Sequence, residues 1–320
     1  VEPDRVKQVE AMKMEGIGWI PESKRFYPKR ELLGNVLGFS GVDNRGLEGL
    51  ERQYDKTLKG KNVELVLERD ARGRLLFGKL GEEVLRGNNL VLTVDEVVQY
   101  ITERELDAAV SDHHAEAGMA IVMQPWTGEI LAMAVRPGFN PNLAGGYHPG
   151  QWRNRIITDV FEPGSTFKMV VAAGILEEKL VRPETLVHDG SASLYVGRSV
   201  IHDPHPADHP LTFEEVIQHS SNVGAAKLGL ILGPEKLYQY MKAFGFGQKT
   251  GIDLPGEVRG LLSSPSKWSG RSLATISIGQ EVAVTPLQII RAMGAIANGG
   301  WLVTPRIVKG IHAPNGEIQE

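Results

Sequence analysis

Cysteine is absent from this sequence of 320 residues. Its absence excludes disulfide bonds, thiolate nucleophiles and cysteine-ligated zinc sites. A chain without thiols also suits a protein that works outside the cytoplasm, where free thiols would be oxidised.

Excess charge of one sign and long apolar runs are absent as well. The 35 Lys and Arg residues face 39 Asp and Glu residues, for a net charge of -4, so the basic excess expected of a nucleic-acid-binding protein is missing. The best apolar stretch, residues 169–176, includes Gly174 and is far shorter than the ~18–20 residues of a membrane span. The chain also has no starting Met and no signal peptide. We therefore expect a soluble chain, cut at its N-terminus, that binds no nucleic acid.

The length predicts two domains, and the charged, glycine-containing stretch at residues 81–89 is the best boundary between them. We expect a first domain at residues 1–88 and a second at 89–320. Short apolar patches between Gly, Arg and Lys predict short strands and turns with one small helix in the first 60 residues. Residues 63–67 and 74–77 flank a glycine turn and predict a hairpin.

The second domain has the pattern of an α+β fold, with helices around an antiparallel sheet. Residues 90–94 predict a strand, and Asp95 predicts the N-cap of the helix after it. Residues 119–123 and 129–135 predict a hairpin whose turn is Pro-Trp-Thr-Gly. Later helices are expected from residue 162 to 176, and after the capping boxes that begin at Thr212 and Thr285.

Ser165 and Lys168 form a Ser-x-x-Lys motif at the start of a predicted helix. This spacing puts both side chains on one face of the first turn, where Lys168 could accept the serine proton if its pKa is lowered. The free N–H groups of the helix start would stabilise an oxyanion. The alternative is that Ser165 is an ordinary N-cap. Ser264 and Lys267 have the same spacing, but they lie in a loop rich in Pro and Ser.

Ser220 and Asn222 form the one Ser-x-Asn pair in the sequence, late in an amphipathic segment that starts at Phe213. Ser220 would extend a proton relay, and Asn222 would hold both Lys168 and a substrate amide. The alternative is a helix terminus, where both residue types are common.

With these motifs the chain resembles the class B penicillin-binding proteins, which are monofunctional cell-wall transpeptidases, over essentially its whole length. The ordered matches are Arg-Phe-Tyr-Pro (25–28), Leu-Gly-Phe (37–39), Gly-Leu-Glu-Gly-Leu-Glu (46–51), Gly-Glu-Ile-Leu-Ala-Met (128–133), Glu-Pro-Gly-Ser-Thr-Phe-Lys (162–168), Ser-Ser-Asn-Val-Gly (220–224), Phe-Gly-Phe-Gly (244–247), Thr-Gly-Ile-Asp-Leu-Pro-Gly-Glu (250–257) and Thr-Pro-Leu-Gln (285–288). The resemblance implies a non-catalytic, β-rich pedestal domain followed by a transpeptidase domain of the serine β-lactamase type.

Lys249-Thr250-Gly251 matches the family's third motif in letters and in order. We reject it, because it lies in a loop punctuated by Gly and Pro, whereas the family's Lys-Thr-Gly lies on a strand beside the nucleophile. By the resemblance, that strand follows the helix that begins at Pro286. We therefore expect it beyond Glu320, in a chain that lacks its last strands.

A metal site is the competing hypothesis for one histidine-rich loop. His202, Asp203, His205, Asp208 and His209 are zinc-ligand types within a short segment. Prolines at 204, 206 and 210 prevent the helical register that aligns two ligands. We favour a solvated surface loop, and we expect no metal and no cofactor.

The resemblance implies a D,D-transpeptidase that cross-links peptidoglycan stem peptides and is acylated by β-lactams. Ser165 would be the nucleophile, Lys168 the base, Ser220 the proton relay to the leaving nitrogen, and Asn222 the residue that orients Lys168 and the donor peptide. The alternatives are a β-lactamase, a β-lactam sensor of the same fold, or a non-catalytic scaffold of the cell-wall machinery.

The implied ligands are D-Ala-D-Ala stem peptides and β-lactams. Cell-wall synthesis proteins are expected to bind the N-terminal domain. The implied location is the cell membrane, with the catalytic domain outside and one N-terminal anchor that this chain lacks.

Overall fold

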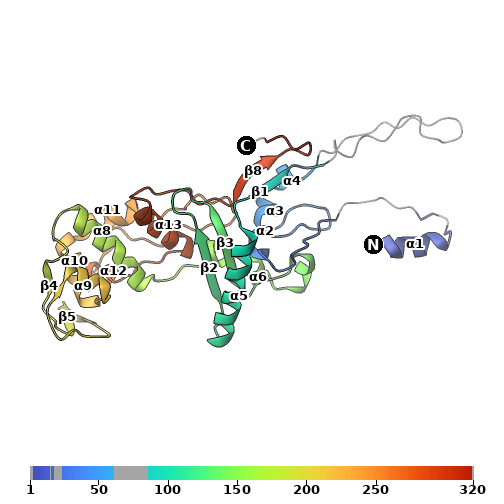
Figure 1. Cartoon of the computed structure of the whole chain (residues 1–320). Helices are drawn as coiled ribbons and strands as arrows, with labels where there is room; N and C mark the ends of the chain where they lie inside the picture. Colours follow the sequence, from blue (N-terminus) through green and yellow to red (C-terminus); the bar gives the residue numbers. More distant parts are fainter. Residues whose placement is uncertain (1–2, 15, 18–23, 61–85, 319–320) are drawn as a thin grey trace.

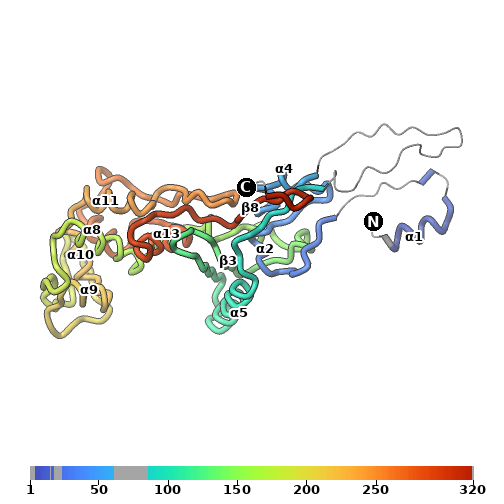
Figure 2. The backbone as a smooth tube through the Cα atoms, turned by 45° about the horizontal axis from the view of Figure 1, so that its top comes forward, coloured from blue at the N-terminus to red at the C-terminus, as the bar shows by residue number. Residues whose placement is uncertain are grey.

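The structure is a computed structural model that describes residues 3–14, 16–17, 24–60 and 86–318. Figures 1 and 2 show an elongated molecule. A helical lobe lies at one end, a β-hairpin with a long helix lies in the middle, and the described N-terminal residues lie at the other end. The hairpin expected at residues 63–77 falls outside the described residues.

The central hairpin consists of β2 (Gly118–Met123) and β3 (Ile130–Arg136), paired antiparallel. Gly128 closes its turn by donating its N–H to the carbonyl of Gln124 at 2.9 Å. Its φ is +73°, and a Cβ there would lie 2.3 Å from the carbonyl oxygen of Thr304, so the position requires glycine. The predicted hairpin is confirmed.

Helix α5 (Glu96–Asp112) packs against this hairpin. The Asp95 carboxylate accepts hydrogen bonds from the N–H groups of Val97 and Val98, both at 2.9 Å, which confirms the predicted N-cap. At its middle, Glu103 forms an ion pair with Arg136 at 3.0 Å and fastens the helix to the end of β3.

The helical lobe surrounds α8 (Lys168–Glu177), in which Val170, Val171 and Ile175 are at most 1% exposed. Gly174 permits close packing of α8, because a Cβ there would lie 2.9 Å from the side chain of Leu232. The predicted capping boxes at Thr212 and at Thr285 are both confirmed. The helices of the lobe and its border are η3 (Gly164–Phe167), α8 (Lys168–Glu177), α9 (Phe213–Gln218), α10 (Asn222–Leu232), α11 (Pro234–Ala243), η4 (Pro265–Lys267), α12 (Ser272–Ser277) and α13 (Pro286–Ala297), where η marks a 3-10 helix.

Two small strand pairs lie at the far end of the lobe: β4 (Leu186–His188) with β7 (Leu211–Thr212), and β5 (Ser193–Val196) with β6 (Ser199–His202). Both pairs are antiparallel. Along the sequence, three short helices follow β3 and precede η3: η2 (Pro141–Gly146), α6 (Pro149–Trp152) and α7 (Arg155–Thr158). Helices and antiparallel strands thus occupy separate segments, as predicted for an α+β fold.

The N-terminal residues differ from the prediction of short strands. Apart from a bridge between Ser40 and Gly46, the described residues 24–60 form turns and the short helices α2 (Gly34–Leu37), α3 (Gly49–Gln53) and α4 (Asp55–Leu58). Earlier, α1 spans Pro3–Ala11.

The physical reason is that these residues are organised by tertiary burial. Leu33, Val36 and Leu50 lie in one hydrophobic cluster with Ile130 and Met133 of β3. Such packing overrides weak local preferences for strand.

The strand predicted at 90–94 is present as β1 (Asn89–Leu92). It pairs antiparallel with β8 (Val308–His312) from the other end of the chain. Among the described residues, no helix combines the length and the apolar character needed to cross a bilayer.

Candidate functional site

Ser165 and Lys168 lie at the start of α8, where the chain first makes the 3-10 turn η3 and then continues as α-helix. The Lys168 N–H donates to the Ser165 carbonyl and closes this turn. Residues three apart eclipse in such a turn, so the two side chains leave the backbone on the same side. Ser165 is exposed, whereas Lys168 is only 3% exposed.

The turn that carries Ser165 is held by a second loop. The N–H of Gly164 donates to the carbonyl of Gly279 at 3.1 Å. Gly279 has a φ of +78°, and a Cβ on it would lie 2.1 Å from the carbonyl oxygen of Gly164. A side chain at position 279 would therefore displace the backbone next to Ser165.

The Lys168 ammonium makes three hydrogen bonds, all to the Ser-x-Asn pair. Its Nζ donates to the Ser220 carbonyl at 2.5 Å, to the Ser220 Oγ at 3.0 Å and to the Asn222 Oδ1 at 2.8 Å. The structure therefore brings together three of the four residues that the sequence singled out, and the fourth lies one turn away. The Ser165 hydroxyl itself makes no hydrogen bond to the described residues.

The buried position of Lys168 destabilises its charged form relative to that of an exposed lysine. Burial lowers the pKa of Lys168 to about 8, and the negative charge of Asp203 opposes this change without cancelling it. An amine with such a pKa can accept a proton near neutral pH, one turn from an exposed hydroxyl.

Ser220 and Asn222 stand at the junction of α9 and α10. Ser220 has a φ of +55°, an uncommon conformation for a residue other than glycine, and this turn directs both its carbonyl and its hydroxyl at Lys168. Asn222 is the first residue of α10, and its Nδ2 donates to the carbonyl of His202 at 3.1 Å. That bond leaves Oδ1 facing Lys168.

Asp203 is a buried neighbour of these residues whose contacts the sequence did not reveal. We predicted a solvated loop here, and this is wrong for Asp203, which is 7% exposed and accepts a hydrogen bond from the Ser221 Oγ at 2.6 Å. Its partners come from α10 and β4, so sequence spacing carries no signal for it. The prediction holds for His205 and Asp208, which are exposed. In the described part of the chain, no group of three or more His, Asp or Glu side chains could hold a metal ion.

Lys249 lies in a loop, as predicted, and its side chain is exposed. The loop is fixed by Glu257, whose carboxylate accepts from the Thr250 N–H at 2.6 Å, from the Thr250 Oγ1 at 2.5 Å and from the Gly251 N–H at 3.1 Å. Thr250 and Gly251 therefore stabilise a local turn through their hydrogen bonds to Glu257.

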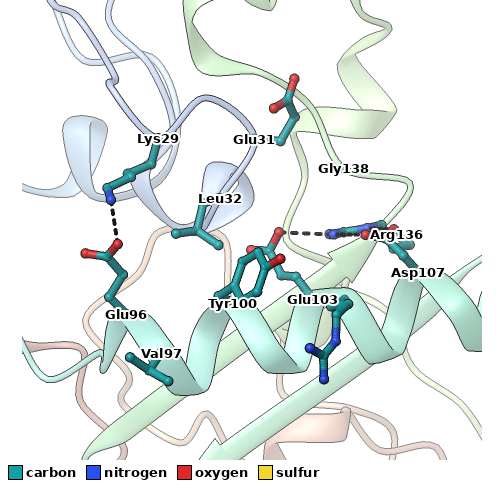
Figure 3. A pocket seen from close by; sticks show the side chains of 11 residues that line it. Lys29, Glu31, Leu32, Glu96, Val97, Tyr100, Glu103, Asp107, Arg136 and Gly138 are labelled. Carbon is teal, nitrogen blue, oxygen red and sulfur yellow. Dashed lines mark hydrogen bonds and ion pairs between the residues drawn. The ribbon is translucent and has the colours of Figure 1, made fainter.

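A cavity of about 790 Å³ lies elsewhere, between residues 29–32 and α5 (Figure 3). Lys29 pairs with Glu96 at 2.5 Å at one end of this cavity, and the ion pair of Glu103 with Arg136 lies at the other. None of the four predicted site residues lines it. This cavity belongs to the junction of the N-terminal residues with α5.

The chain is similar to curated cell-wall proteins along most of its length. It is 40% identical over 312 residues to the stage V sporulation protein D of Bacillus subtilis, covering 96% of this chain and 48% of the relative. It is 37% identical over 300 residues to the peptidoglycan D,D-transpeptidase FtsI of Escherichia coli, covering 94% of this chain and 50% of the relative. The chain thus spans about half the length of these relatives.

The chain is also similar to solved structures of penicillin-binding proteins. The chain matches apo penicillin-binding protein 3 of Mycobacterium tuberculosis with a TM-score of 0.80 and 34% identity, covering 92% of this chain and 63% of that one. The same protein has been solved in complexes with aztreonam and with ampicillin.

Two domain families match the chain. The penicillin-binding protein dimerisation domain matches residues 1–92, and the penicillin binding protein transpeptidase domain matches residues 118–320. These matches confirm the predicted fold class, a pedestal domain followed by a transpeptidase domain. With its Ser-x-x-Lys and Ser-x-Asn elements joined around one buried lysine, the chain belongs to the penicillin-binding protein transpeptidase family.

Proposed function

We propose that this chain is the core of a serine D,D-transpeptidase that cross-links peptidoglycan stem peptides through an acyl-enzyme. The supporting observation is the buried Lys168, whose pKa is lowered to about 8 and whose ammonium is held by Ser220 and Asn222 one turn from the exposed Ser165. A serine hydroxyl becomes an effective nucleophile when such a base takes its proton.

In the proposed acylation, the Ser165 Oγ attacks the carbonyl carbon of the penultimate D-alanine while its proton passes to the Lys168 Nζ. The amide C–N bond then breaks as its nitrogen receives the proton of Lys168 through Ser220, and the terminal D-alanine leaves. An amine of a neighbouring stem peptide then attacks the ester carbonyl, the C–O bond to Ser165 breaks, and the amine proton passes to the Ser165 Oγ. The cross-linked product is released and the serine hydroxyl is restored. β-Lactams would acylate Ser165 in the same way.

Asn222 has a double role in this proposal. Its Oδ1 accepts from Lys168 at 2.8 Å, and one N–H of its amide is engaged by the His202 carbonyl at 3.1 Å. The second N–H is available for the carbonyl of a donor peptide, because an amide nitrogen carries two donors.

The proposed activity also implies the substrates, the partners and the location of the protein. Stem peptides are the substrates, cell-wall synthesis proteins bind through the N-terminal residues, and the catalytic domain lies outside the membrane. The absence of cysteine fits a compartment in which free thiols would be oxidised.

The proposal is tested by incubating the full-length protein with a stem pentapeptide that ends in D-Ala-D-Ala and with an amine acceptor. We expect release of D-alanine and formation of the cross-linked product, both blocked by prior treatment with benzylpenicillin. Rapid turnover of the penicillin instead would identify a β-lactamase. No reaction with either compound would favour a scaffold.

Lys249 provides a second test, because a motif search would assign it to the site. We expect Lys249→Ala in the full-length protein to leave the penicillin acylation rate within about twofold of wild type, since Lys249 is exposed in a loop. An authentic third-motif lysine would bind the substrate carboxylate, and its loss would cost about 1.5–3 kcal/mol, or ten- to over a hundredfold in rate. A decrease of that size in the acylation rate would assign Lys249 to the active site.

A further inference from the structure

The loop after β6 anchors the start of α10. The buried Asp203 carboxylate accepts from the Ser221 Oγ at 2.6 Å, from the Val223 N–H at 3.1 Å and from the Asn222 N–H. These backbone groups are the first donors of a helix, where a negative charge is stabilising. Asp203 therefore fastens the segment that contains Asn222 through both side-chain and backbone contacts.

The same loop sets the direction of the groups that hold Lys168. The His202 carbonyl accepts from the Asn222 Nδ2 at 3.1 Å, which turns the Asn222 Oδ1 toward the lysine. Ser220 precedes the anchored residues and keeps its φ of +55°. A strained backbone of this kind persists only where surrounding contacts hold it.

Asp203 also contacts a buried histidine of β4. His188 of β4 has a side chain that is 0% exposed, and its Nε2 lies 3.3 Å from the Asp203 Oδ2. An ionised carboxylate only accepts, so His188 donates this hydrogen bond. On the other side of the ring, Asp189 lies 3.2 Å from the His188 Nδ1 and pairs with Lys227 of α10 at 2.8 Å. Asp203 therefore sits between β4 and α10 in a fixed orientation.

We propose that Asp203 is a positioning residue that fixes the Ser220–Asn222 turn and, through it, the placement of the Lys168 ammonium. The inference rests on the proposed function insofar as Lys168 acts as the base. Asp203 touches neither Ser165 nor, in this proposal, the substrate.

The negative charge of Asp203 also affects the pKa of Lys168, which can be measured. Ser220 and Asn222 face the ammonium from the α9–α10 turn, and Asp203 is the charged group that acts on it from the loop after β6. Its charge raises the pKa of Lys168 against the effect of burial. Removing that charge should lower the pKa of Lys168 and move the pH at which acylation is half-maximal to a lower value.

The decisive variant is Asp203→Asn in the full-length protein. The amide keeps the size and one acceptor oxygen, but its nitrogen would face the donors of Ser221 and His188. We expect the maximal acylation rate per folded molecule to fall about tenfold or more, with half-maximal acylation at lower pH. The matched control is Asp208→Asn in the same loop, whose side chain is 99% exposed and whose rate should not change.

Two kinetic results would overturn the proposal. In the first, Asp203→Asn melts at a lower temperature but is acylated at the wild-type rate and with the wild-type pH profile. Asp203 would then have only a structural role. If Asp203→Asn does not fold, His188→Gln is used in its place. Wild-type kinetics in that variant would be the second contrary result.

A separate readout distinguishes this inference from the proposed function. Titration of the Lys168 side chain by NMR with 13C-labelled lysine needs no acylation. If wild-type protein does not react with penicillin, the proposed function fails, and the inference still stands or falls on whether Asp203→Asn lowers the pKa of Lys168.

Discussion

Replacing Ser165 by alanine should abolish covalent penicillin labelling of the full-length protein. The acyl-enzyme is an ester on the Ser165 Oγ, so removing this oxygen removes the bond that carries the label. Position 165 is exposed and its hydroxyl makes no hydrogen bond to the described residues, so the variant should fold like wild type. The measurement is gel fluorescence after reaction with a fluorescent penicillin, followed by mass spectrometry of the labelled peptide.

The matched control for this experiment is Ser264→Ala. Ser264 belongs to the second Ser-x-x-Lys match, at the N-cap of the turn η4, and its hydroxyl lies 2.9 Å from that of Ser266. This variant should keep full labelling, on the peptide that contains Ser165. Label retained by Ser165→Ala, or found on Ser220 or Ser264, would refute the assignment of the nucleophile.

Replacing Lys168 by methionine should slow penicillin acylation by about 10²–10⁴-fold, the usual contribution of a general base. Methionine fills a similar volume, so the pocket of the lysine stays occupied. The change leaves the Ser220 and Asn222 acceptors without their donor, at a cost of about 1–3 kcal/mol in folding stability. Stopped-flow or quenched labelling gives the rate, and thermal melting checks the fold.

The control for the lysine is Lys267→Met in the second motif match, where the side chain is exposed and the rate should be unchanged. An acylation rate in Lys168→Met within a factor of a few of wild type would show that another group takes the Ser165 proton.

The pH dependence of the wild-type rate belongs to the same test. The base acts in its neutral form, so acylation should rise with pH and level off above the pKa of Lys168, about 8. At pH 7 about a tenth of the Lys168 side chains would then be neutral, against fewer than about one in a thousand for an ordinary lysine. Lys168→Met should lose this limb of the profile. A wild-type rate that is flat between pH 6 and 9 would contradict the role of Lys168.

Features that depend on a few neighbouring residues were predictable from the sequence. The Asp95 N-cap, the capping boxes at Thr212 and Thr285, and the turn closed by Gly128 all form through hydrogen bonds within about four residues, so their spacing is visible in the chain. The spacing of Ser165 and Lys168 is local in the same sense. The Gly and Pro residues around Lys249 likewise predicted a loop, and Lys249 lies in one.

The remaining features were decided by tertiary structure, because desolvation and long-range hydrogen bonds depend on segments that are distant in the chain. The lowered pKa of Lys168 requires burial in the helical lobe, and the fixed Ser220–Asn222 turn requires Asp203 from another loop. Residues 24–60 form turns and short helices instead of strands because Leu33 and Val36 bury themselves against β3. Sequence spacing records which residue types are available, whereas the fold determines which of them lose water and meet.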